Sequence, residues 1–433
     1  MKASSELIVQ EVSPYLRDST VIWVAYSGGV DSTVLLKLAT EAKLSVPIKA
    51  IHINHQLSPN ANQWAVHCAD FAKSLGVDCI VETVTVENHG KGIEEGARQQ
   101  RYNVFEKHVK RNDILLTAHN LGDQAETLLF RLFRGTGLRG LRGIQQQRRM
   151  GEGRVVRPLL EVAKANIQEY AIAKQLKWIE DESNRDLQFD RNFIRHNIMP
   201  ILKARWAHAE EKIEVATHWI NEADALLHEY VNEDLKRCDL IEERVGESVA
   251  LSVFLQYSFS RQKHIIRYWC ERNNFLFPEI LQLEKLKEVV FAREDAKPLL
   301  CWGDYQLRRF RQRLYLMSKL PDFDAVKLKW NGLEPISLPD GSKLSMKRDD
   351  AKALDISVTF RQGGERCRPE SREHSQTLKK LFQEYNLEPW LRERAPILMI
   401  DGEIAAVAGV FVCHGYGKVL TGLRWSYEDS MRF

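Results

Sequence analysis

Apolar residues follow two alternating patterns along roughly the first 200 positions of the chain. Short continuous apolar runs, which are typical of buried parallel strands, occupy residues 21–26, 48–53, 79–84 and 113–118. Apolar side chains spaced three and four positions apart predict helices between these runs, over residues 32–40, 61–75 and 93–110. Strands that alternate with helices predict an α/β fold with a doubly wound, mostly parallel, Rossmann-like sheet. Such sheets bind ligands beyond the carboxyl ends of their strands.

The pattern changes in the rest of the chain. A long amphipathic helix is predicted over residues 208–235, and two shorter helices over 261–273 and 278–291. Turns become frequent towards the C-terminus, where an Asp-Gly pair at 401–402 predicts a hairpin. We therefore expect three domains, namely an α/β domain at 1–208, a small helical domain at 209–320 and a compact α+β domain at 327–433.

The hydrophobic and cysteine content narrows the class of protein. Hydrophobic residues make up 44% of the 433 residues, which is enough for each domain to bury a core. The seven cysteines are scattered and form no C-x-x-C motif, so the sequence predicts neither a disulfide framework nor a zinc or iron–sulfur site. No apolar run reaches the roughly 18 residues of a membrane span, and the polar N-terminal residues do not resemble an export signal. We expect a cytoplasmic protein that does not enter a membrane.

The positive charge is concentrated in one segment. Residues 131–157 contain eight arginines and a single acid, Glu152, so this segment carries +7 and the rest of the chain −4, within a net charge of +3. A dense arginine segment with interspersed glycines favours a phosphate-binding surface, because glycine lets the backbone approach a ligand closely. The alternative is a loop whose arginines serve only to keep it solvated.

A candidate phosphate loop lies between the first predicted strand and the first predicted helix. It consists of Ser27, Gly28, Gly29, Val30, Asp31 and Ser32. Adjacent glycines let backbone N–H groups turn towards an anion, the helix N-terminus adds its positive end, and the serines add hydroxyl donors. Asp31 would repel a phosphate unless a cation stood between them, so it is a candidate Mg²⁺ ligand. The alternative is an ordinary strand-to-helix turn in which Asp31 or Ser32 caps the helix.

A second group of candidate residues follows the fourth predicted strand. On a helix, His119, Asp123 and Glu126 would share one face, because they are separated by four and three positions. Carboxylates at that place could bind Mg²⁺ and position proton transfer beside the phosphate loop. The alternative is an acidic first turn that is stabilised only by the helix dipole.

These motifs resemble those of a known family. Residues 27–32 are similar to the SGGxDS loop of the N-type ATP pyrophosphatases, or PP-loop enzymes, and residues 119–127 to the HxxDDxxET motif of their lysidine synthetase branch. The chain departs from the second motif at Gly122, where the branch usually has a second Asp. Arg98 and Arg101 resemble its R-x-x-R-Y sequence, and Arg195 the last residue of its D-R-N-x-x-R stretch. The C-terminal region, including a basic loop at 361–369, is similar to a tRNA-contacting domain.

The resemblance implies a reaction and a set of partners. With Mg²⁺ as cofactor, ATP would adenylylate the wobble cytidine in the CAU anticodon of tRNA(Ile). Free L-lysine would then displace AMP. The loop residues 27–32 would hold pyrophosphate, and Asp31 and Asp123 would bind Mg²⁺. Glu126 would position or deprotonate the amine. Arg101 and Arg195 would stabilise phosphate charge. The domain at 1–208 would be catalytic, the two later domains would bind tRNA, and a homodimer is expected.

Two alternatives remain open from the sequence. One is a tRNA thiolase of the same superfamily, although the scattered cysteines do not favour carbon–sulfur chemistry. The other is a non-catalytic tRNA-binding protein that uses ATP only as a switch.

Overall fold

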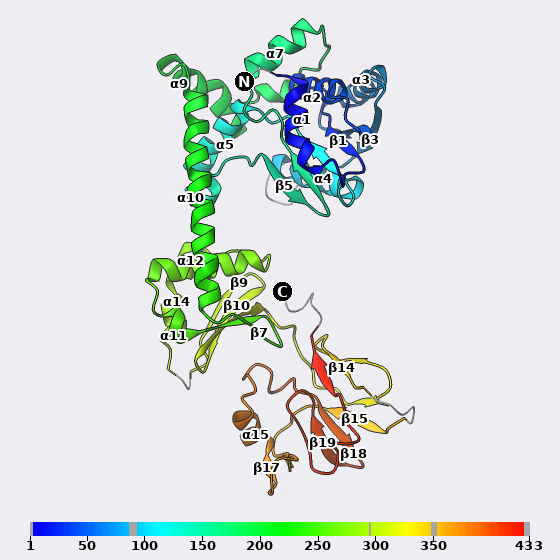
Figure 1. The fold of residues 1–433 in the computed structure, drawn as a ribbon, viewed down its shortest axis with the longest axis vertical. Coiled ribbons are helices and arrows are strands. Elements are labelled where there is room, and N and C mark those ends of the chain that lie inside the picture. The colour runs from blue at the N-terminus through cyan, green and yellow to red at the C-terminus, as the bar shows by residue number, and fades with distance from the viewer. Residues whose placement is uncertain (1–2, 86–92, 294–295, 348–352, 428–433) are drawn as a thin grey trace. The chain divides into compact units, whose positions relative to one another are not determined.

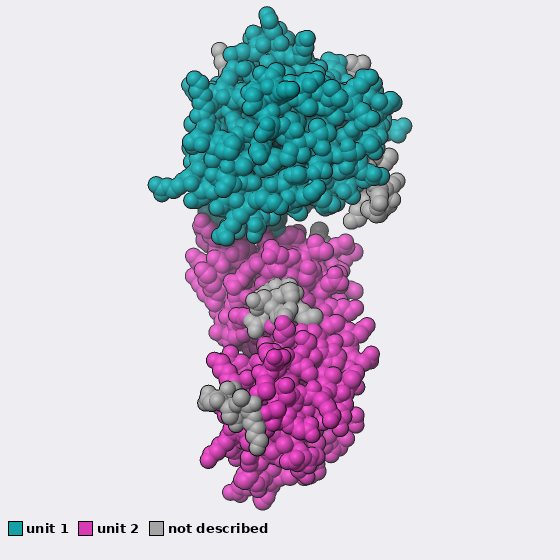
Figure 2. Space-filling view, turned by 90° about the vertical axis from the view of Figure 1, so that its right-hand side faces the viewer, with its two compact units in different colours: residues 1–226 teal, residues 227–433 magenta. Residues whose placement is uncertain are grey.

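The computed structural model describes residues 3–85, 93–293, 296–347 and 353–427 (Figure 1). The chain divides into two compact units, Met1–Leu226 and Leu227–Phe433, which are teal and magenta in Figure 2. The boundary between the units falls inside one long helix, α10 (Ala209–Arg237). No helix among the described residues is both long and apolar enough to cross a membrane.

The first unit is built on a six-stranded sheet with the strand order β3-β2-β1-β4-β6-β5. The strands are β1 (Ile22–Ala25), β2 (Ile48–Asn54), β3 (Asp78–Thr83), β4 (Ile114–Leu116), β5 (Gln147–Met150) and β6 (Gly153–Val156). All neighbouring pairs are parallel except β5 with β6. The four apolar runs are thus confirmed as strands. The β5–β6 hairpin departs from the prediction, because arginines rather than an apolar run occupy much of this sheet edge.

Helices cover both faces of this sheet (Figure 1). The helices of this unit are α1 (Ser5–Val12), α2 (Val30–Glu41), α3 (Ala61–Ser74), α4 (Ile93–His108), α5 (Leu121–Phe133), α6 (Leu138–Leu141), α7 (Lys164–Ala173), α8 (Asp190–Phe193) and α9 (Met199–Arg205). Along β1, Ile22 and Val24 join one core with Leu35 of α2, whereas Trp23 joins a second core with Phe105 of α4. Successive strand residues point to opposite faces, so two cores mean that both faces are covered. The doubly wound prediction is confirmed.

The second unit begins with the end of α10 and a helix-and-sheet region. Its helices are α11 (Leu251–Phe254), α12 (Phe259–Arg272), α13 (Ile280–Glu284) and α14 (Leu286–Val290). They pack beside a five-stranded antiparallel sheet of β7 (Ile241–Glu242), β8 (Glu247–Ala250), β11 (Arg313–Ser318), β10 (Tyr305–Phe310) and β9 (Leu299–Trp302). The prediction of a helical domain at 209–320 omitted this sheet. These strands could not be recognised from the sequence, because β10 and β11 contain arginines instead of a regular apolar pattern. In addition, the turn between them has Arg311 at a φ of 53°, where a glycine would have indicated a hairpin.

Where the structure describes it, the C-terminal region is mainly antiparallel sheet together with the helix α15 (Leu378–Glu384). Its strands are β12 (Leu328–Trp330), β13 (Ile336–Ser337), β14 (Lys343–Ser345), β15 (Ile356–Thr359), β16 (Arg366–Cys367), β17 (Gln376–Thr377), β18 (Ile397–Ile400), β19 (Glu403–Val407), β20 (Phe411–Val412) and β21 (Arg424–Ser426). The predicted hairpin is confirmed between β18 and β19, where Asp401 and Gly402 have φ angles of 51° and 82°. Two successive positive φ values are what a tight hairpin turn requires.

Candidate functional site

The predicted phosphate loop connects β1 to α2, with Gly29 as the N-cap of the helix. The Ser27 backbone N–H donates to Ser32 Oγ over 3.2 Å, and the two serine Oγ atoms lie 3.0 Å apart. Ser32 Oγ in turn donates to the Gly29 carbonyl over 3.0 Å. These bonds close the loop over the first turn of the helix. N–H groups at a helix N-terminus bind anions, so this is a suitable place for pyrophosphate.

Gly28 cannot be replaced by a larger residue without a change in the loop. Its φ is +87°, and a Cβ atom would lie 2.6 Å from Ile179 Cδ1 and 2.8 Å from Cys68 Sγ. The Gly28 carbonyl also accepts a hydrogen bond from the Ile179 N–H over 2.9 Å. Ile179 therefore packs against the phosphate loop and fixes the backbone of Gly28.

We expect Gly28→Ala to lower the free energy of unfolding by about 1–3 kcal/mol, because alanine resists this backbone conformation. The matched control is Gly29→Ala. Gly29 has an ordinary extended backbone with a φ of −70°, and its Cβ would meet nothing closer than Ser27 Oγ at 3.6 Å. Urea denaturation of both variants, monitored by circular dichroism, makes the comparison. Equal stability of the two would contradict the packing argument.

Asp31 lies in the first turn of α2 with one carboxylate oxygen enclosed. Its Oδ1 atom is buried and has no hydrogen-bond partner among the described residues. Burial raises the pKa of Asp31 to about 6, with Lys164 opposing this shift and the Asp123 carboxylate adding to it. At neutral pH the group is thus ionised, although its charge is poorly compensated. A bound cation would satisfy it.

Asp31 and Asp123, the two predicted metal ligands, are compatible with Mg²⁺. The described residues contain no cluster of three or more His, Cys, Asp or Glu side chains arranged to hold a metal. Mg²⁺ does not require one, because it is commonly held by one or two carboxylates together with substrate phosphates and water. Asp31 and Asp123 supply two carboxylates beside the phosphate loop.

The start of α5 differs from the prediction. Asn120 caps this helix, since its Oδ1 accepts hydrogen bonds from the Gly122 and Asp123 N–H groups over 2.9 and 3.2 Å. The Asp123 carboxylate accepts from the Asn120 N–H over 3.0 Å and completes a capping box. His119 therefore precedes the helix instead of sharing a face with Asp123 and Glu126. Its Nδ1 lies 3.0 Å from Thr117 Oγ1, and burial lowers the pKa of His119 to about 4.

Gly122, the departure from the family motif, faces another carboxylate. A Cβ atom at this position would lie 3.4 Å from Glu210 Oε1, at the start of α10. Glu210 itself pairs with Lys203 over 2.7 Å. An aspartate at 122 would place two like charges together, so glycine suits the acid that is present at 210.

Arg195 joins the two carboxylates of α5. Its Nε and Nη2 atoms donate to the two Glu126 oxygens over 2.6 and 2.7 Å, and Nη2 also donates to Asp123 Oδ1 over 3.1 Å. The exposed fraction of the Glu126 side chain is only 7%. Burial raises the pKa of Glu126 in spite of this partner. Because Asp123 and Arg195 both shift the pKa of Asp31, the structure brings four predicted site residues together.

Arg101 is the fifth predicted catalytic residue. It is exposed on α4, and its charge helps to lower the pKa of His55, just beyond the end of β2, after burial as the main cause. Its predicted role in stabilising phosphate charge stays a prediction. Arg98, three positions earlier on α4, lies over the Tyr102 ring at 5.1 Å.

Lys164 is a site residue that the sequence reasoning missed. It opens α7, and its charge opposes the effect of burial on the pKa of both Asp31 and Glu126. The sequence could have indicated Lys164, because the helix dipole disfavours a positive charge in the first turn of a helix. A lysine at such a position indicates that a nearby negative charge stabilises it. The carboxylates of Asp31 and Glu126 provide that charge.

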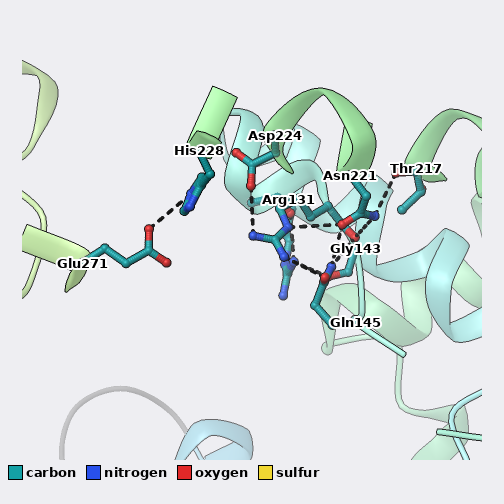
Figure 3. A network of polar contacts seen from close by, with 10 residues as sticks. Arg131, Gly143, Gln145, Thr217, Asn221, Asp224, His228 and Glu271 are labelled. Carbon is teal, nitrogen blue, oxygen red and sulfur yellow. Dashed lines mark hydrogen bonds and ion pairs between the residues drawn. The ribbon is translucent and has the colours of Figure 1, made fainter. Parts of the chain in front are cut away.

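The arginines of segment 131–157 fall into two groups, those bonded within the protein and those exposed on its surface. Some of its arginines are structural: Arg131 Nη1 donates to the Gly140 and Gly143 carbonyls, each over 2.8 Å, and Arg142 binds Asp224 of α10 over 2.9 Å (Figure 3). Asn221 of α10 also donates to the Arg142 carbonyl over 3.0 Å. Four arginines are exposed, namely Arg134, Arg139, Arg148 and Arg149. The phosphate-binding prediction therefore applies to the exposed arginines only.

Comparison with known proteins shows which family the chain belongs to. Residues 2–202 match the family described as a PP-loop domain, residues 250–315 the TilS substrate binding domain, and residues 356–425 the TilS substrate C-terminal domain. A tRNA(Ile)-lysidine synthase from Coxiella burnetii is 36% identical over 418 residues, which cover 94% of this chain and 92% of that protein. One from Alkalilimnicola ehrlichii is 38% identical over 400 residues, 89% of each chain. The chain therefore belongs to the tRNA(Ile)-lysidine synthase family.

Proposed function

We propose that this protein is an ATP-dependent carbon–nitrogen ligase that converts the wobble cytidine of tRNA(Ile) with a CAU anticodon to lysidine. The observation that carries the proposal is Asp31, a residue of the phosphate loop that has one buried carboxylate oxygen without a partner among the described residues, and whose pKa responds to Asp123 and Arg195. Its relatives' names supply the substrate. The cytoplasm, where tRNA is modified, is the expected location.

The reaction has two steps. In the first, the O2 atom of cytidine attacks the α-phosphorus of ATP, the bond to the β-phosphate oxygen breaks, and pyrophosphate leaves. Ser27, Gly28, Gly29, Val30 and Ser32 hold that pyrophosphate through backbone N–H groups and hydroxyls. In the second, the ε-amine of L-lysine attacks C2, AMP leaves with the O2 atom, and the amine gives up a proton.

The acidic residues of α2 and α5 would bind the cation and the amine that take part in the reaction. Asp31 and Asp123 would hold Mg²⁺, which neutralises phosphate charge when it is bound. Glu126 is suited to position the lysine amine or to accept its proton, since its raised pKa makes it a stronger base than an exposed glutamate. Arg195 keeps the Glu126 carboxylate fixed through two hydrogen bonds, and its positive charge would stabilise negative charge on nearby phosphates.

The later domains would hold the rest of the tRNA. We assign residues 1–208 to catalysis, and 209–320 and 327–433 to tRNA binding. The exposed arginines of 131–157 and the basic loop 361–369 supply charge for backbone phosphates. We also expect a homodimer, for which the molar mass in solution, measured by light scattering, is the test.

One assay separates this function from its alternatives. The purified protein is incubated with bulk tRNA, Mg-ATP and labelled lysine, and the tRNA nucleosides are then analysed by mass. Lysidine with equimolar AMP and pyrophosphate is the expected product. A sulfur-containing nucleoside would indicate a thiolase, and nucleotide binding without AMP release would indicate a switch; either result contradicts the proposal.

A further inference from the structure

A cavity of about 270 Å³ lies in the second unit, far along the chain from the candidate active site. It is lined by Phe310, Arg311, Gln312, Gln383 and Arg392. These residues come from the turn between β10 and β11, the end of α15 and the segment after it. Arg311 belongs to the matched substrate binding domain, and Arg392 to the matched C-terminal domain. The cavity is thus formed by two domains together.

The guanidinium groups at this cavity are held in place by the backbone. Arg311 Nη2 donates to the Gln383 carbonyl over 3.0 Å, and Arg392 Nε donates to the Leu387 carbonyl over 2.9 Å. Phe310 lies under both side chains, with its ring centre 5.6 Å from Arg311 Cζ and 6.0 Å from Arg392 Cζ. Each of these bonds uses one edge of a guanidinium, so further N–H donors remain for a ligand.

Positive charge exceeds negative charge around the cavity. Arg361 and Arg311 both act on Arg392, and together with burial, the larger cause, they lower its pKa. The one acid that opposes this shift is Glu388, which also interacts with Arg244. Arg361 Nε is buried and has no hydrogen-bond partner among the described residues. A partly buried arginine cluster is costly unless an anion compensates it.

We propose that this cavity binds a phosphate group of RNA. Guanidinium forks match the geometry of phosphate oxygens, and two of them, Arg311 and Arg392, line this cavity from two domains, while Arg361 adds positive charge that acts on Arg392. The size suits a single phosphate with part of its nucleotide and excludes a duplex. The inference rests on the proposed function, because tRNA is the polyanion which that function requires, while the phosphates of ATP are assigned to the loop in the first unit. One phosphate would join the substrate binding domain to the C-terminal domain.

The test uses the full-length protein with Arg311→Gln, in an exposed turn, and Arg392→Gln. We expect each variant to weaken tRNA binding about tenfold, as for the loss of a hydrogen bond to a charged group. The slope of log K against log salt should fall by about 0.7–0.9 for each variant, since one phosphate contact is lost. The KM values for ATP and lysine, and kcat at saturating tRNA, should not change. Arg311→Lys, which keeps the charge but loses the fork, should be intermediate.

Arg237→Gln is the matched control, since Arg237 is an exposed arginine of the second unit paired with Glu233 over 3.4 Å. It should bind tRNA as the wild type does. Wild-type affinity and salt slope in folded Arg311→Gln would overturn the proposal. The proposal would also be overturned if millimolar inorganic phosphate bound at this cavity while the variants bound tRNA as tightly as the wild type. That result would identify a site for free phosphate. If the wild type makes no lysidine but the variants still lose tRNA affinity, only the proposed function fails.

Discussion

Asp31→Ala is expected to lower ATP-dependent incorporation of lysine into tRNA by at least about 10²-fold to 10³-fold, the effect of removing one main group that stabilises transition-state charge. The Asp31 carboxylate has a buried oxygen without a partner, next to the loop that would hold pyrophosphate. Without it, Mg²⁺ would keep only Asp123. The measurement is single-turnover formation of lysidine with saturating ATP. A near-normal rate would remove Asp31 from the mechanism.

Asp31→Asn separates the charge of this residue from its shape. A carboxyl whose pKa is raised on folding stabilises the fold below its unfolded pKa of about 4, and this contribution is lost as the pH rises through about 6. Without Mg²⁺, Asp31→Asn should therefore be more stable than the wild type above pH 6, while being inactive. Mg-ATP should raise the melting temperature of the wild type and leave that of the variant almost unchanged. A stabilised variant that keeps its activity would contradict the Mg²⁺ assignment.

Arg195→Ala should be the most destabilising change in the first unit that leaves its apolar cores intact. It removes both hydrogen bonds of the Glu126 carboxylate, which has an exposed fraction of 7%, and a third bond to Asp123. Breaking a buried pair by removing one partner costs about 3–5 kcal/mol, because an uncompensated charge is left behind. Lysidine formation should fall at the same time, since Glu126 loses its fixed position.

The control for Arg195 is Lys174→Ala, which breaks a more exposed pair with Glu41 in the same unit. Glu41 keeps its hydrogen bond from Tyr170, so the loss should not exceed about 1 kcal/mol. Urea denaturation gives both values. Arg195→Lys should recover part of the stability, although one lysine cannot reproduce the paired bonds to Glu126. Equal destabilisation by the two alanine substitutions would show that Glu126 is compensated by other groups.

The first unit could be predicted well because its signals are local. A buried parallel strand reads as a continuous apolar run, and a glycine pair between such a run and a helix marks a phosphate loop. The sheet in 241–318 could not be predicted in this way, since its strands mix arginines with apolar residues and the turn at Arg311 carries no glycine. Pairing between β8 and β11 joins segments distant in the sequence, which periodicity does not reveal.

Four of the predicted residues, Asp31, Asp123, Glu126 and Arg195, lie together in the structure, but their contacts could not be predicted, and Lys164 was missed. The spacing of Asp123 and Glu126 placed both on one side of α5, whereas the cap formed by Asn120 excluded His119 from that helix. Arg195 lies after α7 and Lys164 is the first residue of α7. Both are far along the sequence from Asp31, so periodicity could not predict that they lie near it. For Arg142 the sequence predicted a contact that the structure does not show. The arginine-rich segment suggested that it binds phosphate, but its side chain pairs with Asp224.

The bond between the Ile179 N–H and the Gly28 carbonyl has a consequence for biosynthesis. The phosphate loop is translated early, yet the residue that fixes its backbone is added to the chain much later, after all six strands of the sheet. While the ribosome is still making the sheet, Gly28 lacks both this bond and its packing against Ile179. In the nascent protein, the phosphate loop can therefore reach its final conformation only after all strands of the sheet have been synthesised.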